Sequence, residues 1–278
     1  MTNHKITLGY SPCPNDTFIF DAMVHHKIDT EGLAFEVVLA DVEALNTKAF
    51  AQELMVTKLS YHAFAHLVND YALLHAGSAL GTNCGPLLIA KTNAQPSENS
   101  TVAIPGKYTT ANFLLQLAFP QLQQKTETLF SDIEKNIIDK KQDFGLIIHE
   151  NRFTYAQKGL VKIADLGELW EQRTGLPIPL GGIVVHRSVP TEIQQKINRV
   201  LRRSVEFALA NPAQTMAYVS EHAQEMQPEV MQAHINLYVN QYSVDLGETG
   251  KAAIARMFAE ARKLAVIPES NLPIFVQR

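Results

Sequence analysis

The chain has 278 residues, of which 46% are hydrophobic, so it is long enough to bury one large core or the cores of two ordinary domains. Its 28 acidic and 24 basic side chains give a formal net charge of −4, which argues against a protein that binds nucleic acid or an anionic membrane. The sequence shows neither a secretory signal nor an apolar run of the roughly 20 residues that a bilayer span requires. We therefore expect a globular, cytoplasmic protein whose partner is a small molecule, while the oligomeric state stays open.

Strand and helix patterns alternate from the start of the chain. The expected strands are residues 5–10, 33–40, 54–60, 71–77 and 85–92, and the expected helices are 16–26, 41–53 and a segment that begins at 61. Asn15 or Asp16 is the expected N-cap of the first helix, and Asp41 that of the second. This alternation predicts a largely parallel sheet with helices on both faces.

A polar stretch at 92–100 predicts the first crossing between two domains. A second α/β pattern follows, with strands expected at 101–106, 126–131 and 143–150 and helices at 109–119, 131–140 and 166–175. A strand at 179–188 is the expected return crossing, and the segment from Pro190 to Leu264 is almost wholly helical, with Pro212 and Pro228 at helix starts.

Two α/β lobes joined by two crossings are typical of the two-lobed, type II periplasmic-binding-protein-like fold, which has a cleft between its lobes. We expect residues 1–92 plus 187–278 to form a larger, discontinuous lobe and residues 93–186 to form a smaller inserted lobe. In such a fold helix N-termini direct backbone amides at the ligand, so a small carboxylated molecule is the expected ligand.

Several familiar site motifs are excluded. The segment IPGKYTT has Thr101 where a P-loop requires its first glycine, so a nucleotide-binding loop is not indicated. His62 and His66 have a spacing that suits a metal ion, yet Ala63 stands where a zinc protease carries glutamate and a third ligand is not evident. We interpret the two histidines as packing residues of a helix and expect no metal site. Cys13 and Cys84 lie far apart and are expected to be free thiols.

Candidate binding residues lie at strand ends or helix starts, where this architecture places its cleft; the segments expected there are 11–16, 58–60, 106–111 and 145–150. Ser60, Thr109 and Thr110 each combine a hydroxyl group with an expected helix N-terminus, a combination that suits a carboxylate or a polyol. Ordinary N-capping explains each hydroxyl equally well, so both interpretations stay open.

His149 is the candidate base. It ends the apolar run FGLIIH and precedes the polar, aromatic segment ENRFTY, which places it at the expected mouth of the cleft. An imidazole exchanges a proton near neutral pH, and the adjacent Glu150 is a group that would tune it. A structural role for a histidine at a strand end is the alternative.

Five segments together resemble the 1,4-dihydroxy-6-naphthoate synthases of the futalosine route to menaquinone. They are LGYSPCPNDTFIF (8–20), VTKLSYHA (56–63), IPGKYTTANFLL (104–115), GLIIHENRFTY (145–155) and LPIPLGGI (176–183). The resemblance implies a cofactor-independent carbon–carbon lyase that cleaves cyclic de-hypoxanthinyl futalosine into 1,4-dihydroxy-6-naphthoate and dihydroxyacetone.

The resemblance also implies roles for single residues. His149 matches the histidine that the family uses as proton acceptor. The positions that match its substrate-binding residues are Lys58, Leu59, Ser60, Thr110 and Ala111, with Thr109 and Asn46 as further candidates.

Three other functions stay open at this point, of which a regulatory effector-binding domain is weakened by the lack of a helix-turn-helix region in the sequence. A solute-binding protein for a small carboxylate shares the fold, although such proteins normally carry a secretory or lipoprotein signal. Chorismate dehydratase, an enzyme of the same route, is also similar in fold, but the SPCPND turn and the IIHENRFTY segment argue against it.

Overall fold

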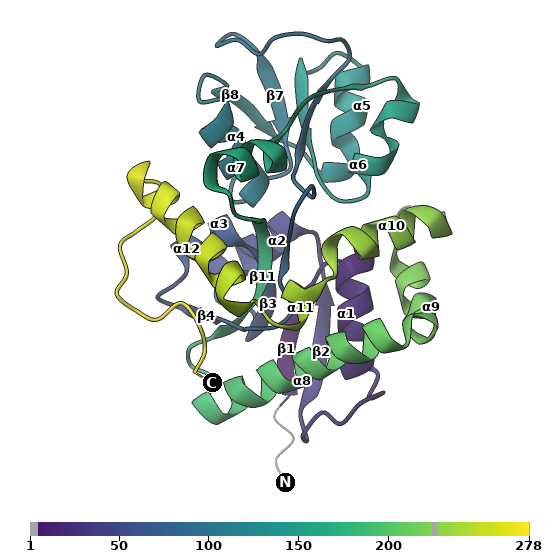
Figure 1. Cartoon of the computed structure of the whole chain (residues 1–278), viewed down its shortest axis with the longest axis vertical. Helices are drawn as coiled ribbons and strands as arrows, with labels where there is room; N and C mark the ends of the chain where they lie inside the picture. Colours follow the sequence, from purple (N-terminus) through teal and green to yellow (C-terminus); the bar gives the residue numbers. More distant parts are fainter. Residues whose placement is uncertain (1–4, 224–226, 278) are drawn as a thin grey trace. The chain divides into compact units, whose positions relative to one another are not determined.

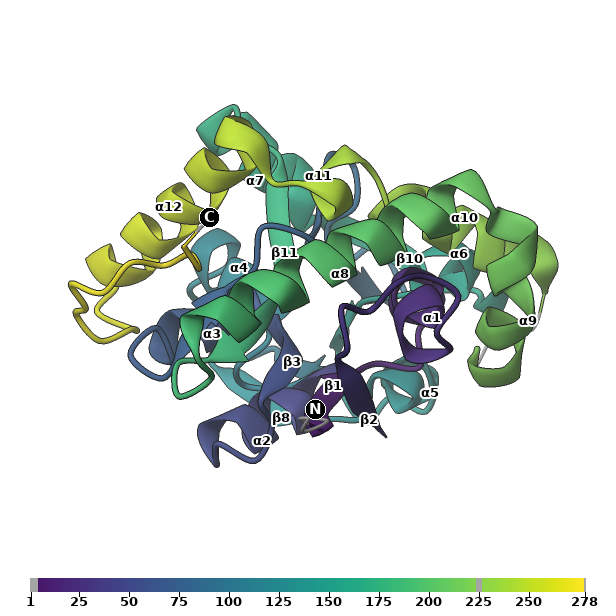
Figure 2. The same cartoon turned by 90° about the horizontal axis from the view of Figure 1, so that it is seen from below.

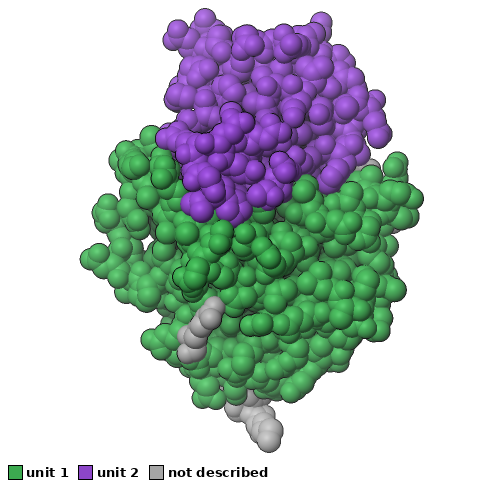
Figure 3. Space-filling view, in the orientation of Figure 1, with its two compact units in different colours: residues 1–81, 179–278 green, residues 82–178 purple. Residues whose placement is uncertain are grey.

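The computed structural model describes residues 5–223 and 227–277, so residues 224–226 of the predicted helical tail lie outside this description. The chain divides into two compact units (Figure 3). Unit 1 takes the chain up to Gly81 and again from Pro179 onward, and unit 2 is the inserted segment Thr82–Ile178. The predicted organisation, in which one α/β unit interrupts another, therefore corresponds to the observed division, although the boundaries differ.

Unit 1 contains a sheet whose strands follow the order β2-β1-β3-β11-β4, with β5 paired to β11 (Figure 1). The strands are β1 (Lys5–Tyr10), β2 (Ala34–Leu39), β3 (Val56–Ser60), β4 (Tyr71–Leu73), β5 (Ala79–Gly81) and β11 (Ile178–His186). β1 is parallel to β2 and to β3, whereas β11 runs antiparallel to β3 and to β4. The predicted parallel sheet is thus interrupted by β11.

Helices pack against both faces of this sheet. Ile6, Leu8 and Tyr10 alternate along β1 and enter the core that the sheet shares with α1 and α8. Gly9, between them, faces Leu45 of α2 on the opposite side. Figure 2 shows α1 lying beside α8. The first helices of unit 1 are α1 (Pro14–Val24), α2 (Val42–Phe50) and α3 (Tyr61–His66).

The last part of unit 1 is helical, as predicted. Its helices are α8 (Thr191–Ala210), α9 (Pro212–His222), α10 (Pro228–Tyr238), α11 (Gln241–Val244) and α12 (Gly247–Lys263). Pro212 and Pro228 occupy the first turns of α9 and α10, where a missing backbone N–H is harmless. α8, α9 and α10 all contact α1, so the C-terminal helices reach the start of the chain. Among the described helices, none combines the length and apolarity that a bilayer crossing requires.

Unit 2 is built on a second sheet, with strand order β10-β6-β9-β7-β8. Its strands are β6 (Leu87–Ala90), β7 (Thr101–Ile104), β8 (Gln124–Glu127), β9 (Phe144–Ile147) and β10 (Val161–Asp165). β7 is parallel to β8 and β9, while β6 is antiparallel to β9 and β10. The helical segments are α4 (Thr110–Ala118), η1 (Phe130–Asp132), α5 (Ile133–Ile138), α6 (Asn151–Thr154), η2 (Tyr155–Lys158) and α7 (Leu166–Thr174).

The predicted lobe boundaries at 92/93 and 186/187 differ from those observed. β6 hydrogen-bonds to β9 and β10 and is therefore a strand of unit 2, although we assigned its residues to the larger lobe. β11 pairs with β3 and β4 and belongs to unit 1, although we assigned it to the smaller lobe. Both assignments depend on which strands pair with one another, and the local sequence pattern carries no information on strand pairing.

Some predicted elements differ in detail. The first helix begins at Pro14 with Cys13 as N-cap, so Asn15 and Asp16 lie inside its first turn and are not its cap. Proline at the first helical position fixes a helical φ and starts the helix early. The strand predicted at 71–77 ends at Leu73, and β5 and β10 were not predicted. In contrast, Asp41 caps α2 as expected, through hydrogen bonds from two backbone amides.

Candidate functional site

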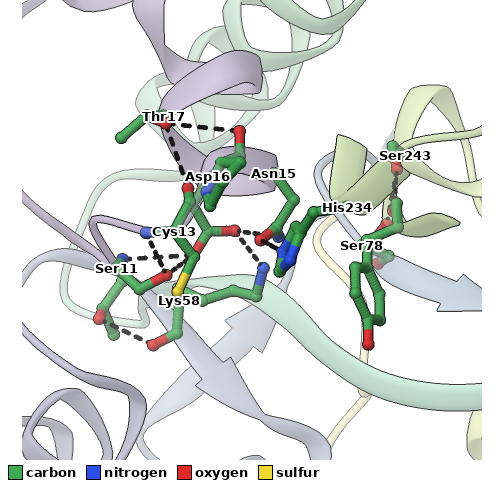
Figure 4. A network of polar contacts seen from close by, with 12 residues as sticks. Ser11, Cys13, Asn15, Asp16, Thr17, Lys58, Ser78, His234 and Ser243 are labelled. Atoms are coloured by element: carbon green, nitrogen blue, oxygen red, sulfur yellow. Dashed lines mark hydrogen bonds and ion pairs between the residues drawn. The ribbon is translucent and has the colours of Figure 1, made fainter. Parts of the chain in front are cut away.

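A buried ion pair lies where β1 leads into α1. Asp16 Oδ1 is 2.6 Å from Lys58 Nζ, and both side chains are buried (Figure 4). Asp16 Oδ2 accepts hydrogen bonds from Ser11 N at 3.2 Å and from Ser11 Oγ at 2.7 Å. Because an isolated charge is costly to bury, the two groups depend on each other. The turn after β1 thus holds the ammonium group of Lys58 in place.

Two further residues extend this network. Asn15 Nδ2 donates to Asp16 Oδ1 at 2.8 Å, and Asn15 Oδ1 lies 2.8 Å from His234 Nε2. His234 lies on α10 and is fully buried. From the sequence we expected segment 11–16 to lie at the cleft but assigned no binding or catalytic role to Asn15 or Asp16, and we did not single out His234. Asp16 carries a local signal, since it is an acidic residue in the first turn of the helix that follows a strand, whereas His234 is one histidine among the residues of an ordinary amphipathic helix.

Ser60 and Asn46 form a second polar group in unit 1. Asn46 Oδ1 accepts from the backbone N–H of Ser60 at 3.1 Å, and Asn46 Nδ2 is 3.4 Å from Ser60 Oγ. Ser60 is the N-cap residue of α3 but makes no capping hydrogen bond through its side chain. The structure therefore brings Ser60 and Asn46 together, and Lys58 and Leu59 precede Ser60 on β3.

In unit 2 the predicted hydroxyls lie at the start of α4. Thr109 is the N-cap: its Oγ1 accepts from Asn112 N at 3.1 Å and donates to Gly106 O at 2.8 Å. The Thr109 hydroxyl is thus used to cap the helix, which is the simpler of the two interpretations. Thr110 and Ala111 form the buried first turn that follows.

His149 follows β9 and has an unusual backbone conformation. Its φ is +57°, in the left-handed region that few residues other than glycine occupy. Such a conformation costs on the order of 1–2 kcal/mol and persists only where the surroundings hold it. The half-buried His149 ring contacts the Phe130 ring edge to face, with centroids 5.0 Å apart. The imidazole therefore has a defined position within unit 2.

The segment after His149 is tied down on one side by a buried carboxylate. Asn151 Nδ2 donates to Glu134 Oε2 at 2.7 Å, and Lys158 Nζ lies 2.6 Å from the same oxygen. Glu134 belongs to α5 and is buried. The helical turn that begins directly after His149 is thus anchored to α5.

A guanidinium group ties down the other side. Arg152 donates to the carbonyl oxygens of Gly85 and Asn83 and, at 2.8 Å, to Asp165 Oδ2. The other Asp165 oxygen accepts from the backbone amides of Gly167 and Glu168 and caps α7. These bonds join the segment that follows His149 to the start of β6 and to the end of β10, which lie at the same end of this antiparallel pair because Leu87 pairs with Asp165.

The other residues considered from the sequence, two histidines and two cysteines, are packed against neighbouring residues. His62 and His66 stack edge to face on α3 with ring centroids 5.1 Å apart, in line with their interpretation as packing residues. Cys13 and Cys84 are both buried free thiols. Burial raises the pKa of the Cys84 thiol to about 12, which makes it a poor nucleophile.

Comparison with known proteins connects this architecture to a biosynthetic family. The sequence model of a family described as menaquinone biosynthesis matches residues 6–263. A 1,4-dihydroxy-6-naphthoate synthase of Thermus thermophilus is 45% identical over 271 residues, which cover 98% of this chain and 99% of that protein. A synthase of the same name from Streptomyces coelicolor is 41% identical and covers 96% of both chains.

Solved structures show the same fold. A crystal structure of an Archaeoglobus fulgidus protein superimposes with a TM-score of 0.91 at 36% identity and covers 96% of this chain and all of that one. The periplasmic aliphatic sulphonate binding protein of Escherichia coli superimposes with a TM-score of 0.66 at 10% identity, covering 96% of this chain and 90% of its own. The second likeness concerns the fold alone, and it confirms the predicted periplasmic-binding-protein-like architecture.

Proposed function

Since this chain belongs to the menaquinone biosynthesis family, we propose that it releases 1,4-dihydroxy-6-naphthoate from cyclic de-hypoxanthinyl futalosine, with dihydroxyacetone as the second product. The observation that carries the proposal is the near full-length similarity to two synthases of that name, at 45% and 41% identity. The same similarity favours the synthase over chorismate dehydratase and over a solute-binding protein.

His149 is the proposed general base. Its support is geometric: the residue follows a buried strand, its ring is half-buried against Phe130, and the segment that follows it is anchored by Asn151 and Arg152. A base that is held in one position needs little reorganisation when it takes a proton. An imidazole also has an ordinary pKa near neutrality, so it exchanges protons at physiological pH.

Lys58 and Ser60 are the proposed substrate-binding side chains of unit 1. Leu59 lies between them on β3, and Asn46 forms a hydrogen bond with Ser60. The ammonium group of Lys58 has three donors, and one of them is directed at Asp16. The ion pair is neutral as a whole, so the remaining donors would bind a carboxylate mainly through hydrogen bonds. In unit 2 the proposed positions are Thr110 and Ala111 in the first turn of α4, with Thr109 as its cap.

The proposed reaction begins when His149 takes a proton from the sugar-derived ring of the substrate. The electron pair left behind drives cleavage of carbon–carbon and carbon–oxygen bonds, and the proton is returned to the departing three-carbon fragment. Formation of the aromatic naphthalene diol supplies the driving force. Because the product ring itself accepts the electrons, this chemistry makes no demand for an added electron sink.

The direct test is to incubate the purified protein with cyclic de-hypoxanthinyl futalosine, without any added cofactor, and to follow both products by chromatography and mass spectrometry. We expect equal amounts of the naphthoate and dihydroxyacetone. Chorismate, offered in parallel, should remain unchanged. If the futalosine derivative is not consumed, or if chorismate is dehydrated instead, the proposed function is wrong.

A further inference from the structure

A series of hydrogen bonds connects helix α10 to Lys58, entirely within unit 1. His234 Nε2 lies 2.8 Å from Asn15 Oδ1, Asn15 Nδ2 lies 2.8 Å from Asp16 Oδ1, and Lys58 Nζ lies 2.6 Å from that same oxygen. All four side chains are buried. Figure 4 shows them pointing toward one another, although they come from three separate parts of the sequence.

The chemistry of these groups determines which group donates and which accepts in each of these hydrogen bonds. An ionised carboxylate only accepts hydrogen bonds, so the amide of Asn15 must turn its NH₂ group toward Asp16. Its oxygen then faces His234, and this oxygen only accepts. His234 must therefore carry a proton on Nε2, and it donates to Asn15, which in turn donates to Asp16.

These hydrogen bonds restrain the Asp16 carboxylate, which Lys58 contacts. Ser11 binds Oδ2 of Asp16 through two donors, and Asn15 binds Oδ1, so both carboxylate oxygens are fixed. A lysine side chain has many rotamers, and an unrestrained ammonium group would sample several positions. The stem of Lys58 passes beside Gly181 of β11, where a Cβ atom would lie only 3.1 Å from Lys58 Cε. Since the stem is confined beside β11, the contact with Asp16 determines where the ammonium group points.

We propose that His234 and Asn15 are positioning residues for substrate binding, which act through Asp16 on the ammonium group of Lys58. This inference rests on the proposed function, because it takes Lys58 as a group that binds the substrate. The proposal assigns a role to α10, a helix that contains none of the sequence motifs and takes no part in the proposed reaction. The restraint sets how well Lys58 is preorganised for the substrate and leaves the proton transfer at His149 untouched.

The test is a double-mutant cycle in the steady-state conversion of cyclic de-hypoxanthinyl futalosine. We expect His234→Ala and Asn15→Ala each to raise KM by about 3- to 10-fold, the range that one lost hydrogen bond gives, while kcat changes by less than about 2-fold. The double variant should have the KM of Asn15→Ala alone, since that change already disconnects His234 from Asp16. A merely structural role for His234 would give independent effects that multiply.

Two further variants complete the experiment. His234→Gln retains an N–H donor at a similar reach and should restore a KM close to that of the wild type. Gln232→Ala, which removes an exposed hydrogen bond to Asn236 on the same helix, should leave both kinetic constants unchanged. If His234→Ala does not fold at the assay temperature, the comparison of His234→Gln, Asn15→Ala and their combination takes its place.

The outcomes separate the two proposals. Wild-type protein that does not turn over the substrate overturns the proposed function and this inference with it. Wild-type turnover combined with multiplying effects in the double variant, or with an unchanged KM in a folded His234→Ala protein, overturns the positioning role alone.

Discussion

The carboxylate of Glu134 accepts a hydrogen bond from the amide of Asn151 at 2.7 Å, which joins α5 to the residue two positions after His149. Both side chains are buried. Because His149 has a left-handed φ of +57°, its conformation depends on how firmly the chain on either side is held. This bond is one of the contacts that hold it.

Glu134→Ala should therefore reduce both stability and turnover. The change removes the acceptor for Asn151 and for Lys158, and we expect the free energy of unfolding to fall by about 1–3 kcal/mol, as for hydrogen bonds to charged groups. Urea unfolding measures this, and kcat should fall as the His149 position becomes less defined. Lys135→Ala, which removes an exposed ion pair with Asp139 on the same helix, is the matched control and should change neither. Equal behaviour of the two variants would contradict the anchoring role.

Arg152→Lys should be destabilising although it keeps the charge. One guanidinium group donates to Asn83, Gly85 and Asp165, and a single ammonium group does not reach all three acceptors. We expect a loss of about 1–3 kcal/mol in urea unfolding. The reciprocal control is Lys162→Arg at the exposed pair with Glu168, where the expected change is below about 0.5 kcal/mol. A stable Arg152→Lys protein would show that its carbonyl contacts contribute little.

His149→Asn tests the base itself. Asparagine tolerates a left-handed backbone, so the segment should keep its conformation while the imidazole is lost. If His149 acts as a general base, kcat should fall by about 10²- to 10⁴-fold, and KM should stay close to its wild-type value. Steady-state kinetics, with circular dichroism as the check on folding, decide this. Normal turnover in the variant would remove His149 from the mechanism.

Gly85→Ala should be among the most disruptive small substitutions in unit 2. A Cβ atom at position 85 would lie 2.1 Å from the backbone nitrogen of Gly167, and backbone atoms at the start of α7 have little freedom to move. Overpacking of this kind typically costs about 1–3 kcal/mol or more. Gly167→Ala brings its Cβ to 2.8 Å from Gly85 and should be milder. Thermal unfolding of the two variants tests this order, and the reverse order would contradict the packing argument.

Stability should decrease at alkaline pH because of Cys84. Burial raises the pKa of its thiol from 9.0 to about 12. Below about 9 both the folded and the unfolded chain keep the thiol proton, so its contribution to stability is fully present. Between about 9 and 12 only the folded chain keeps it, and this contribution is lost with a slope of at most about 1.4 kcal/mol per pH unit.

Cys84→Ala isolates this effect, because buried tyrosines such as Tyr61 also have a raised pKa and destabilise the fold in the same direction. Urea unfolding at a series of alkaline pH values should give a steeper decline for the wild type than for the variant. Parallel declines would show that the thiol titrates alike in both states.

Much of the architecture was predictable because it is encoded locally. Strand and helix alternation follows from the spacing of apolar residues, and Asp41 and Thr109 were identified as helix starts because a cap bonds to amides only two or three positions away. Proline fixed the starts of α9 and α10 in the same way. The pattern before His149 also indicated a buried strand, although β9 ends at Ile147 and the strand expected at 143–150 therefore does not include His149.

The α/β class, the interruption of one α/β pattern by another and the resemblance to a known family could all be inferred from the residues alone. Which unit each boundary strand joins, the left-handed backbone at His149 and the partners of Lys58 depend on long-range packing. Asp16 lies 42 positions from Lys58, and His234 lies 219 positions from Asn15. Pairings over such separations depend on how helices pack against a completed sheet, and a periodic pattern along the chain carries information only about neighbours within a few turns.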